Sequence, residues 1–567
     1  MKLLFTHCDY LEYEAKKQAI KEAEPASPGK VRVDECLVAF CTAEEGDDER
    51  IIDLAVREIK DVSNQVNCKT IVIYPFVHLS SKPAKPAVAL KIVKGIEDEL
   101  KSKYAVSRAP FGWYKAFSLR CKGHPLSELS REVRLGDDVT KKTNKESKQS
   151  VGKIILDRRS LPPNDHRILG EDLGIFHFSD EVGAGLPLWL PNGETLRFLL
   201  IKYMREIEER YGYKYVSTPH ITRGALYEKT GHLPYYRDSM YAPIDIEGEE
   251  YYLKPMNCPH HHMIFSKVAE SYRDLPLRLA EAGMTYRFEL SGVTYGLIRV
   301  KCFTQNDSHI YVTPHQLKEE FKKVLELFKE VYNVMGIKNY WFRLSLPDFK
   351  NNPDKYTGDP GEWDHACEEI RKAMKEFGAK VVEGEGEAAF YGPKIDVQIK
   401  NSLGKEETIA TSQVDIVVPK RLGLSYIDSD GSKKTPIVIH RAILGSYERF
   451  IAYLLEQTEG RLPLWLSPIQ IKVMNFTDRN TSAAQSLVKK LKDAIPEIRI
   501  DTDYRNETIQ AKIRDAELQK IPYILVIGDK EEESKTVAVR SRGKKPQFGV
   551  NLDAFLAQLK EEISLRK

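Results

Sequence analysis

The sequence predicts a multidomain protein that combines α+β and α/β domains, with three structured parts and a linker. Its 567 residues are too many for one hydrophobic core, since a domain usually holds roughly 100–200 residues. Hydrophobic residues make up 42% and charged residues 30%, as in an ordinary globular protein. Strand-like and helix-like stretches alternate near both ends, whereas the middle part mixes strands with long helices.

The first predicted domain covers residues 1–137. Apolar spacing predicts its elements: strands over 2–10, 33–40, 69–79 and 114–121, and helices over 48–62 and 86–101. Residues 137–150 (DDVTKKTNKESKQS) are polar and lysine-rich with almost no apolar side chains. Such a stretch cannot bury a core, so we predict a linker over residues 138–180.

The second predicted domain covers residues 181–465. Its clearest helix begins at Thr313, where Gln316 completes a capping box, and an apolar stripe runs from Leu317 until Gly336 ends the helix. Strand–helix repeats then fill residues 466–567, and the final helix opens at Asn551. We therefore expect a small α/β domain at the C-terminal end.

Charge, cysteine content and apolar runs indicate the cellular location of the protein and the partners that it can bind. A net charge of +3 requires any nucleic-acid surface to come from local patches. The eight cysteines include no CxxC pair, which is typical of buried thiols in a reducing compartment. The N-terminus is too polar for a signal peptide, and no run approaches the roughly 18 apolar residues that cross a bilayer. We expect a cytoplasmic protein without a membrane partner.

Two strand-like segments gather polar side chains on one face. In residues 284–290 (MTYRFEL), Arg287 and Glu289 are two positions apart. In residues 298–310, alternation predicts one face with five polar side chains and one aromatic ring: Arg299, Lys301, Phe303, Gln305, Asp307 and His309. Alternation alone favours a solvated sheet face. The combination also suits a site that clamps phosphates, stacks a base and binds a small polar molecule.

These segments resemble a known family. YRFELSG and GLIRVKCFTQNDSHI resemble the second signature motif of class II aminoacyl-tRNA synthetases in its threonyl form. KPMNCPHH, AFYGPKIDVQI, TSQVDIVVPKRLGLSYI and IHRAILGSYERF resemble the threonyl-tRNA synthetase family in the same order. The resemblance implies a class II catalytic core with an antiparallel sheet. It also implies activation of L-threonine with ATP and transfer to tRNA(Thr).

The resemblance assigns a role to each matching residue. Arg287 would contact the α-phosphate and the threonine carboxylate, and Glu289 would hold the adenine amino group. Arg299 and Arg449 would grip the γ-phosphate, with Mg²⁺ accompanying ATP, and Phe303 would stack on adenine. Asp307 would accept a hydrogen bond from the threonine hydroxyl. The remaining implied residues of the amino-acid and phosphate pocket and of the third motif are Lys394, Gln305, Tyr391, Thr411, Gln413 and Glu448.

A metal site follows from the resemblance rather than from spacing. Cys258, His309 and His440 lie far apart in the chain, and a lone histidine is more often structural. His260, His261 and His262 crowd beside Cys258 and offer a different ligand set. The resemblance selects Cys258, His309 and His440, which would hold one Zn²⁺ per chain and leave a position open for substrate.

A second site is expected at the N-terminal end. Serine lacks only one methyl group of threonine, which is worth only about 1–3 kcal/mol, so binding alone cannot exclude it. YPFVHLSS, APFGWYKAF and CKGHPLSELSR resemble the editing domain of archaeal-type threonyl-tRNA synthetases, which shares its α/β fold with D-aminoacyl-tRNA deacylases. The match implies that four residues form the site that hydrolyses seryl-tRNA(Thr): His78, Tyr114, Lys115 and Glu128.

The local sequence around Lys115 also indicates an unusual environment for this lysine. It shares a strand face with Phe117 and Leu119, so we expect partial burial and a lowered pKa. Without the resemblance, a lysine that reaches water from an edge strand is the simpler interpretation.

The C-terminal domain resembles the anticodon-binding domain of several class II synthetases. Four residues occupy the positions of the anticodon readers: Arg505, Asn506, Glu533 and Arg542. Solvated loop charges are the alternative interpretation. The stretch KYVSTPHI around Pro219 resembles the first class II motif, which implies a homodimer.

Two other classes of protein remain open from the sequence. One is an RNA-binding regulator built on an inactive synthetase domain, and the other is a D-aminoacyl-tRNA deacylase fused to a nonfunctional partner. The retained Arg287 and Arg449 and the complete set of zinc ligands argue against the regulator. Threonine-dependent ATP–pyrophosphate exchange distinguishes a synthetase from either alternative.

Overall fold

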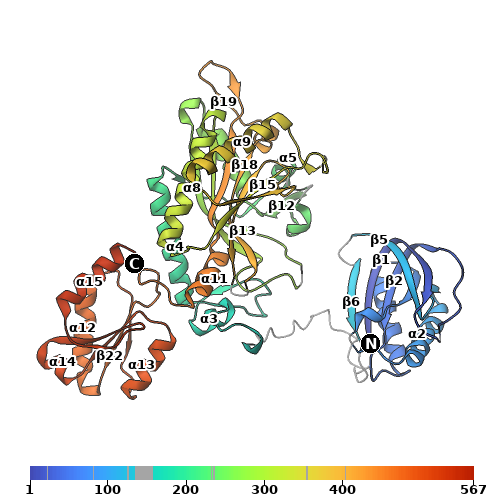
Figure 1. Cartoon of the computed structure of the whole chain (residues 1–567), viewed down its shortest axis with the longest axis horizontal. Helices are drawn as coiled ribbons and strands as arrows, with labels where there is room; N and C mark the ends of the chain where they lie inside the picture. The colour runs from blue at the N-terminus through green and yellow to red at the C-terminus, as the bar shows by residue number, and fades with distance from the viewer. Residues whose placement is uncertain are drawn as a thin grey trace. The chain divides into compact units, whose positions relative to one another are not determined.

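The computed structural model describes residues 1–566 apart from 22, 81, 124–126, 134–157, 232, 234–235, 291, 353–354 and 402–403. The chain divides into two compact units, residues 1–150 and 151–567. The first is drawn in blue in Figure 1, and the second runs from green to red.

The first unit is a six-stranded sheet with helices on one face. Its strands are ordered β4-β3-β2-β1-β5, and β6 also pairs with β1. The elements are β1 (Lys2–Gln18), β2 (Val31–Thr42), α1 (Ile51–Gln65), β3 (Thr70–Pro75), α2 (Pro86–Lys101), β4 (Ala105–Arg108), β5 (Trp113–Cys121) and β6 (Glu128–Glu132). The buried sides of α1 and α2 form one core with the sheet, so the expected α/β domain is confirmed.

The second unit is built on an eight-stranded mixed sheet, ordered β16-β15-β17-β18-β21-β14-β13-β9. Its strands are β9 (Lys214–Tyr215), β13 (Leu277–Tyr286), β14 (Cys302–Val312), β15 (Trp341–Leu346), β16 (Val381–Glu385), β17 (Lys394–Lys400), β18 (Glu406–Asp415) and β21 (Ile437–Ser446). The pairs from β15 through β13 are antiparallel, and only the two edge pairs are parallel. The expected antiparallel core is therefore present within a mixed sheet.

Long helices pack against this sheet in one continuous hydrophobic core. They are α4 (Pro191–Arg210), α8 (Leu317–Val334), α9 (Pro360–Phe377) and α11 (Tyr447–Thr458). The expected capping box of Thr313 and Gln316 is present before α8, and the apolar stripe of that helix is buried. The shorter elements are α3 (His166–Asp172), β7 (Phe176–His177), β8 (Leu188–Trp189), β10 (Ile221–Arg223), α5 (Gly224–Lys229), β11 (Ile244–Ile246), β12 (Glu249–Leu253), α7 (Cys258–Val268), α10 (Val418–Leu422), β19 (Tyr426–Ile427) and β20 (Lys433–Lys434).

The predicted linker needs a correction. Residues 138–157 lie outside the described residues, but from residue 158 onward the chain is folded. Leu169, Leu173, Ile175 and Phe176 are buried in the same core as the long helices. The second predicted domain thus begins well before residue 181, because the apolar side chains of residues 169–176 are part of its hydrophobic core.

The C-terminal part is a five-stranded sheet, ordered β23-β22-β24-β25-β26, with helices around it (Figure 1). Its elements are β22 (Ile471–Asn475), α12 (Thr481–Ala494), β23 (Ile500–Asp503), α13 (Ile509–Leu518), β24 (Tyr523–Ile527), α14 (Asp529–Ser534), β25 (Thr536–Ser541), β26 (Gln547–Asn551) and α15 (Leu552–Ser564). The Asn551 side chain caps α15 as expected. Among the described residues, no helix is both long and apolar enough to cross a membrane.

Candidate active site and metal centre

A cavity of about 360 Å³ opens over the central strands of the large sheet. Strands β14, β18 and β21, the loop after β13 and the first residues of α7 and α11 supply its walls. Thirteen of the residues expected at the catalytic site line it: Cys258, Arg287, Glu289, Arg299, Phe303, Gln305, Asp307, His309, Tyr391, Thr411, Gln413, His440 and Arg449. Segments that are distant in the chain thus meet in one site.

Four arginines line the cavity, and one of them, Arg441, is ion-paired with Glu208. The Arg287 guanidinium lies 5.1 Å from the centre of the Phe303 ring, and burial lowers its pKa. Arg299 is ion-paired with Glu289 at 2.9 Å. Arg449 donates from Nε to the carbonyl oxygen of Ile298 at 3.0 Å. Planar cations held in this way suit several phosphate groups at once.

The local structure of this region differs from the expected strands. β13 ends at Tyr286, so Arg287 and Glu289 lie in the following loop rather than on a strand face. β14 starts only at Cys302, so Arg299 and Lys301 are also in the loop. Lys301 does not line the cavity; its ammonium lies 5.3 Å from the centre of the Phe288 ring instead. The alternation of side chains along a strand therefore applies only from Phe303 onward.

Two other expected residues lie behind the cavity wall and do not line it. Lys394 donates to Asp396 at 2.7 Å, and the same carboxylate accepts from the Thr411 hydroxyl at 2.9 Å. Glu448 is buried and accepts from the backbone N–H of Thr304 at 2.9 Å. Burial raises the pKa of Glu448 to about 7. Lys394 is thus linked to the lining residue Thr411 through Asp396, whereas Glu448 holds the backbone of β14 next to Phe303 and Gln305.

The three expected metal ligands come together. Ligand atoms of Cys258, His309 and His440 all lie within 4.8 Å of one another. His309 on β14 is directly opposite His440 on β21, and Cys258 is the first residue of α7. A thiolate and two imidazoles are a ligand set that suits Zn²⁺ and leaves a fourth position open.

The protonation properties of these groups fit a cation. Burial and the nearby Asp307 and Asp415 raise the pKa of the Cys258 thiol well above its usual value. Burial lowers the pKa of His309 well below its usual value, so its imidazole is neutral, as a metal ligand must be. With its pKa raised in this way the thiol stays protonated unless a positive charge lies beside it, and a metal ion bound here would supply that charge.

A second combination, His262 with Asp415 and His440, also has close ligand atoms. The structure favours a different role for these residues. Asp415 accepts from the backbone N–H groups of Val417 and Val418, and its other oxygen lies 3.1 Å from Nε2 of His440. Neither His262 nor Asp415 lines the cavity. Asp415 thus orients His440 in the manner of the carboxylate–histidine pairs that support metal ligands.

The cavity floor offers polar groups for a small ligand. Asp307 accepts from Asn257 at 3.0 Å, and the Tyr391 hydroxyl donates to Oε1 of Gln413 at 2.8 Å. Nε2 of Gln413 is buried and has no hydrogen-bond partner among the described residues. Since buried donors are nearly always satisfied, this amide indicates where a ligand acceptor belongs.

The first unit has a cavity of its own, of about 720 Å³. His78, Tyr114 and Lys115 line it together with Tyr74 and Phe117. The fourth expected residue, Glu128, does not line this cavity; it lies on β6 opposite Thr6 of β1.

Lys115 has the environment that the sequence predicted. Its amine donates to the carbonyl oxygens of Pro110 at 3.0 Å and Trp113 at 3.3 Å. It also lies 5.0 Å from the centre of the Tyr74 ring. Burial lowers its pKa to about 8. An amine with such a pKa is available as a base near neutral pH.

The expected anticodon readers fall into two groups. Arg505 and Asn506 follow β23, and Glu533 lies on α14 after β24, so all three are at the carboxyl ends of the parallel strands. Arg542 is at the opposite end, since its N–H bonds the carbonyl of Pro522 just before β24. The Arg542 guanidinium also donates to the carbonyl oxygens of Lys520 at 2.8 Å and Leu462 at 2.7 Å. It therefore secures the junction with the catalytic domain.

Three family models match successive parts of the chain. They describe the archaea-specific editing domain of threonyl-tRNA synthetase over residues 1–133, the class II tRNA synthetase core domain (G, H, P, S and T) over 241–458, and an anticodon binding domain over 467–562. A crystal structure of the RNA binding domain of threonyl-tRNA synthetase from Cryptosporidium parvum is 35% identical, with a TM-score of 0.65. The match covers 98% of that chain and 70% of this one. The chain belongs to the threonyl-tRNA synthetase family.

Other similarities agree with membership of this family. A threonine–tRNA ligase from Listeria welshimeri is 45% identical over 418 residues, which are 74% of this chain and 65% of that protein. The chain thus spans slightly less than two thirds of the length of this relative. A prolyl-tRNA synthetase structure from Cryptosporidium parvum, 14% identical with a TM-score of 0.54, shares the fold alone. The three-domain architecture of the threonyl-tRNA synthetase family is therefore present here.

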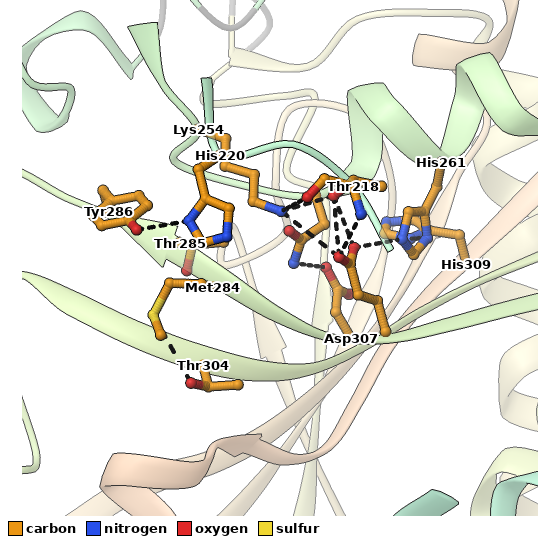
Figure 2. Close-up of polar contacts among 12 residues, drawn as sticks. Thr218, His220, Lys254, His261, Met284, Thr285, Tyr286, Thr304, Asp307 and His309 are labelled. Carbon is orange, nitrogen blue, oxygen red and sulfur yellow. Dashed lines mark hydrogen bonds and ion pairs between the residues drawn. The ribbon is translucent and has the colours of Figure 1, made fainter. Parts of the chain in front are cut away.

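The structure adds site residues that the motifs of the threonyl-tRNA synthetase family did not reveal. His261 contacts His309 (Figure 2). Glu281 contacts His261, and Asn257 contacts Asp307. One signal was available in the sequence. Glu281 interrupts the otherwise largely apolar strand β13, and a carboxylate in the middle of a buried strand needs partners.

Proposed function

We propose that the chain is a threonine–tRNA ligase. It activates L-threonine with ATP, transfers the threonyl group to tRNA(Thr), and hydrolyses seryl-tRNA(Thr) in its N-terminal domain. The observation that carries the proposal is the cavity in which a thiol and two imidazoles lie beside Asp307 and the guanidinium groups of Arg287, Arg299 and Arg449. Such a site can hold an amino acid with a hydroxyl group and a nucleoside triphosphate side by side.

The arginines are assigned to ATP. Arg287 holds the α-phosphate, Arg299 and Arg449 hold the γ-phosphate, and Mg²⁺ accompanies the nucleotide. Adenine stacks on Phe303, and Glu289 accepts from its amino group. When the threonine carboxylate attacks the α-phosphorus, pyrophosphate leaves with additional negative charge. Fixed guanidinium groups stabilise that charge without reorganisation.

Threonine occupies the part of the cavity next to the metal ligands. A Zn²⁺ held by Cys258, His309 and His440 would supply a Lewis acid for the amino and hydroxyl groups. Asp307 accepts a hydrogen bond from the threonine hydroxyl, and Nε2 of Gln413, which has no partner among the described residues, donates to the substrate. Three other expected pocket residues line the cavity around the substrate: Gln305, Tyr391 and Thr411. Lys394 and Glu448 lie behind the cavity wall.

Amino-acid-dependent ATP–pyrophosphate exchange tests this function. We expect strong exchange with threonine and about 10–200-fold lower kcat/KM with serine, which lacks one methyl group. Valine has no hydroxyl, so we expect a loss of about 10⁴-fold or more. Absence of exchange with threonine would instead support the RNA-binding regulator or the deacylase fused to a nonfunctional partner.

Editing is assigned to the cavity of the first unit. A neutral Lys115 amine has two N–H groups, which the carbonyls of Pro110 and Trp113 accept, and a lone pair that remains available. We propose that this lone pair accepts a proton from the attacking water. His78 and Tyr114 hold the ester end of seryl-tRNA(Thr), and Glu128 would have to act from outside the cavity wall.

Substitution of Lys115 by methionine is expected to slow deacylation of seryl-tRNA(Thr) by about 10²–10⁴-fold, the usual contribution of a general base. The wild-type rate above spontaneous hydrolysis should rise with pH and level off above about 8, because the pKa of Lys115 is about 8 and only the neutral amine accepts a proton. Exchange with threonine should not change. A wild-type profile that is flat between pH 6.5 and 9, or full activity of the variant, would contradict this role.

The remaining assignments concern tRNA and assembly. Arg505, Asn506 and Glu533 read the anticodon loop at one end of the C-terminal sheet, and Arg542 supports that domain at the other. A homodimer forms around Pro219. Exposed Ile221, Ile244 and Ile246 on the nearby three-stranded sheet support such an interface. Sedimentation equilibrium at micromolar concentration tests it, since a monomer mass would refute the dimer.

A further inference from the structure

A row of buried polar side chains lies behind the metal ligands, outside the cavity itself. His261 is on α7, Glu281 is on β13, Thr218 follows β9 and Lys254 follows β12; all four are buried. None of them lines the cavity. Figure 2 shows the row from Lys254 through Thr218 to His261 and His309. Buried polar groups in this position require a reason, since desolvating them is costly.

The contacts in the row are continuous. Nδ1 of His309 lies 2.8 Å from Nδ1 of His261, and Nε2 of His261 lies 3.2 Å from Oε2 of Glu281. The carboxylate also accepts from the Thr218 backbone N–H at 2.8 Å and from the Thr218 hydroxyl at 2.9 Å. The amino group of Lys254 donates to the same hydroxyl at 2.7 Å.

These contacts leave one consistent arrangement of protons. Because Nδ1 of His309 is taken by His261, only Nε2 can face a cation, and it must then carry a lone pair. The proton of His309 is therefore on Nδ1 and is donated to Nδ1 of His261. That leaves the proton of His261 on Nε2, where Glu281 accepts it.

The opposite arrangement fails at Glu281. If Nδ1 of a neutral His261 donated to His309, Nε2 of His261 would be unprotonated. Two acceptors, this nitrogen and the Glu281 carboxylate, would then face each other. His309 would then carry its proton on Nε2 and lose its ligand atom. Burial raises the pKa of Glu281, but the hydrogen bonds from His261 and Thr218 and the charge of Lys254 outweigh it and leave that pKa below its ordinary value. The ionised Glu281 carboxylate can only accept a hydrogen bond from His261. It therefore selects the arrangement in which Nε2 of His309 is unprotonated and can bind a metal.

We infer that His261 and Glu281 are positioning residues that fix the tautomer and orientation of His309 and so set the metal affinity of the site. The inference rests on the proposed metal site. His440 receives the matching support from Asp415 at 3.1 Å, so each imidazole ligand has its own partner. Through the metal, the two residues also control how tightly threonine binds, although neither touches the substrate.

Zinc affinity of the full chain tests the inference, measured by competition with a chromogenic chelator. In Glu281→Gln the amide oxygen is required by the Thr218 backbone N–H, so the NH2 group faces His261 and favours the wrong arrangement; we expect zinc to bind about 10–100-fold more weakly. His261→Leu should lose a similar factor. His261→Gln should lose less, because an amide can both accept from His309 and donate to Glu281.

His260→Gln is the matched control. His260 is a buried histidine on the same helix, and neither of its ring nitrogens has a hydrogen-bond partner among the described residues. We expect wild-type zinc affinity from this variant. At saturating zinc, the KM for threonine of Glu281→Gln should return toward the wild-type value, which a general loss of structure would not allow.

Zinc affinities of Glu281→Gln and His261→Leu within threefold of the control would overturn the inference. Failure of both variants to fold while His260→Gln folds would also overturn it, since the role would then be structural. Cys258→Ser separates the inference from the proposal beneath it. If Cys258→Ser binds zinc normally, the metal site itself is wrong; if it loses zinc while Glu281→Gln does not, only the positioning role fails.

Discussion

Replacement of Arg287 by alanine is expected to lower kcat for threonine-dependent ATP–pyrophosphate exchange by about 10²–10³-fold, the usual effect of removing one donor that stabilises developing charge. The guanidinium is half-buried against Phe303 and faces the cavity, where water screens it weakly. It is assigned to the phosphate at which the bond to pyrophosphate breaks. Its contact therefore strengthens as negative charge develops, so kcat should fall more than the affinity for threonine.

Two further variants make this prediction specific. Arg287→Lys keeps the charge but loses the planar fork, so its exchange rate should lie between those of the wild type and the alanine variant. Arg205 is an exposed arginine on α4 that is paired with Glu209, and Arg205→Ala should leave exchange unchanged. Exchange by Arg287→Ala within threefold of the wild type would remove Arg287 from the reacting site.

Substitution of Cys258 by serine is expected to abolish stoichiometric zinc binding and to reduce threonine-dependent exchange by more than about 10²-fold. Loss of a residue that only supports a ligand costs about 10–100-fold in metal affinity, and loss of the ligand itself should cost more. The thiol is buried at the start of α7, so serine fits the space but offers no soft donor.

Metal analysis after gel filtration measures this prediction. The wild type should contain about one zinc per chain, as expected for a three-ligand site with one open position. Cys367 is another buried cysteine, on α9 and outside the cavity, so Cys367→Ser should keep its zinc. Unchanged zinc content in Cys258→Ser would show that the cation, if present, is held elsewhere.

Much of the fold could be predicted from local sequence. The helix α8 begins after the capping box of Thr313 and Gln316 and buries the expected stripe, because capping and periodicity act within a few residues. The alternating strands and helices of the two end domains are confirmed for the same reason. The predicted start of the second domain at residue 181 was too late. The polar, lysine-rich composition of the preceding stretch does not indicate where the next buried residues begin.

The candidate site was harder to predict from the residues alone. His309 and His440 are 131 positions apart, and only the register between β14 and β21 places them opposite each other. The family motifs supplied the ligands, but not His261 and Glu281, whose roles depend on contacts between α7 and β13. Likewise, position in a motif could not show that Arg542 faces backbone carbonyls at a domain junction.

Zinc K-edge X-ray absorption on the full chain, with and without amino acids, tests most directly whether a metal-centred pocket recognises the hydroxyl of threonine. We expect one sulfur near 2.3 Å and two imidazole nitrogens at about 2.0–2.1 Å from the metal. Threonine should add an oxygen ligand that valine cannot supply. A spectrum without sulfur, or one that threonine leaves unchanged, would contradict the account.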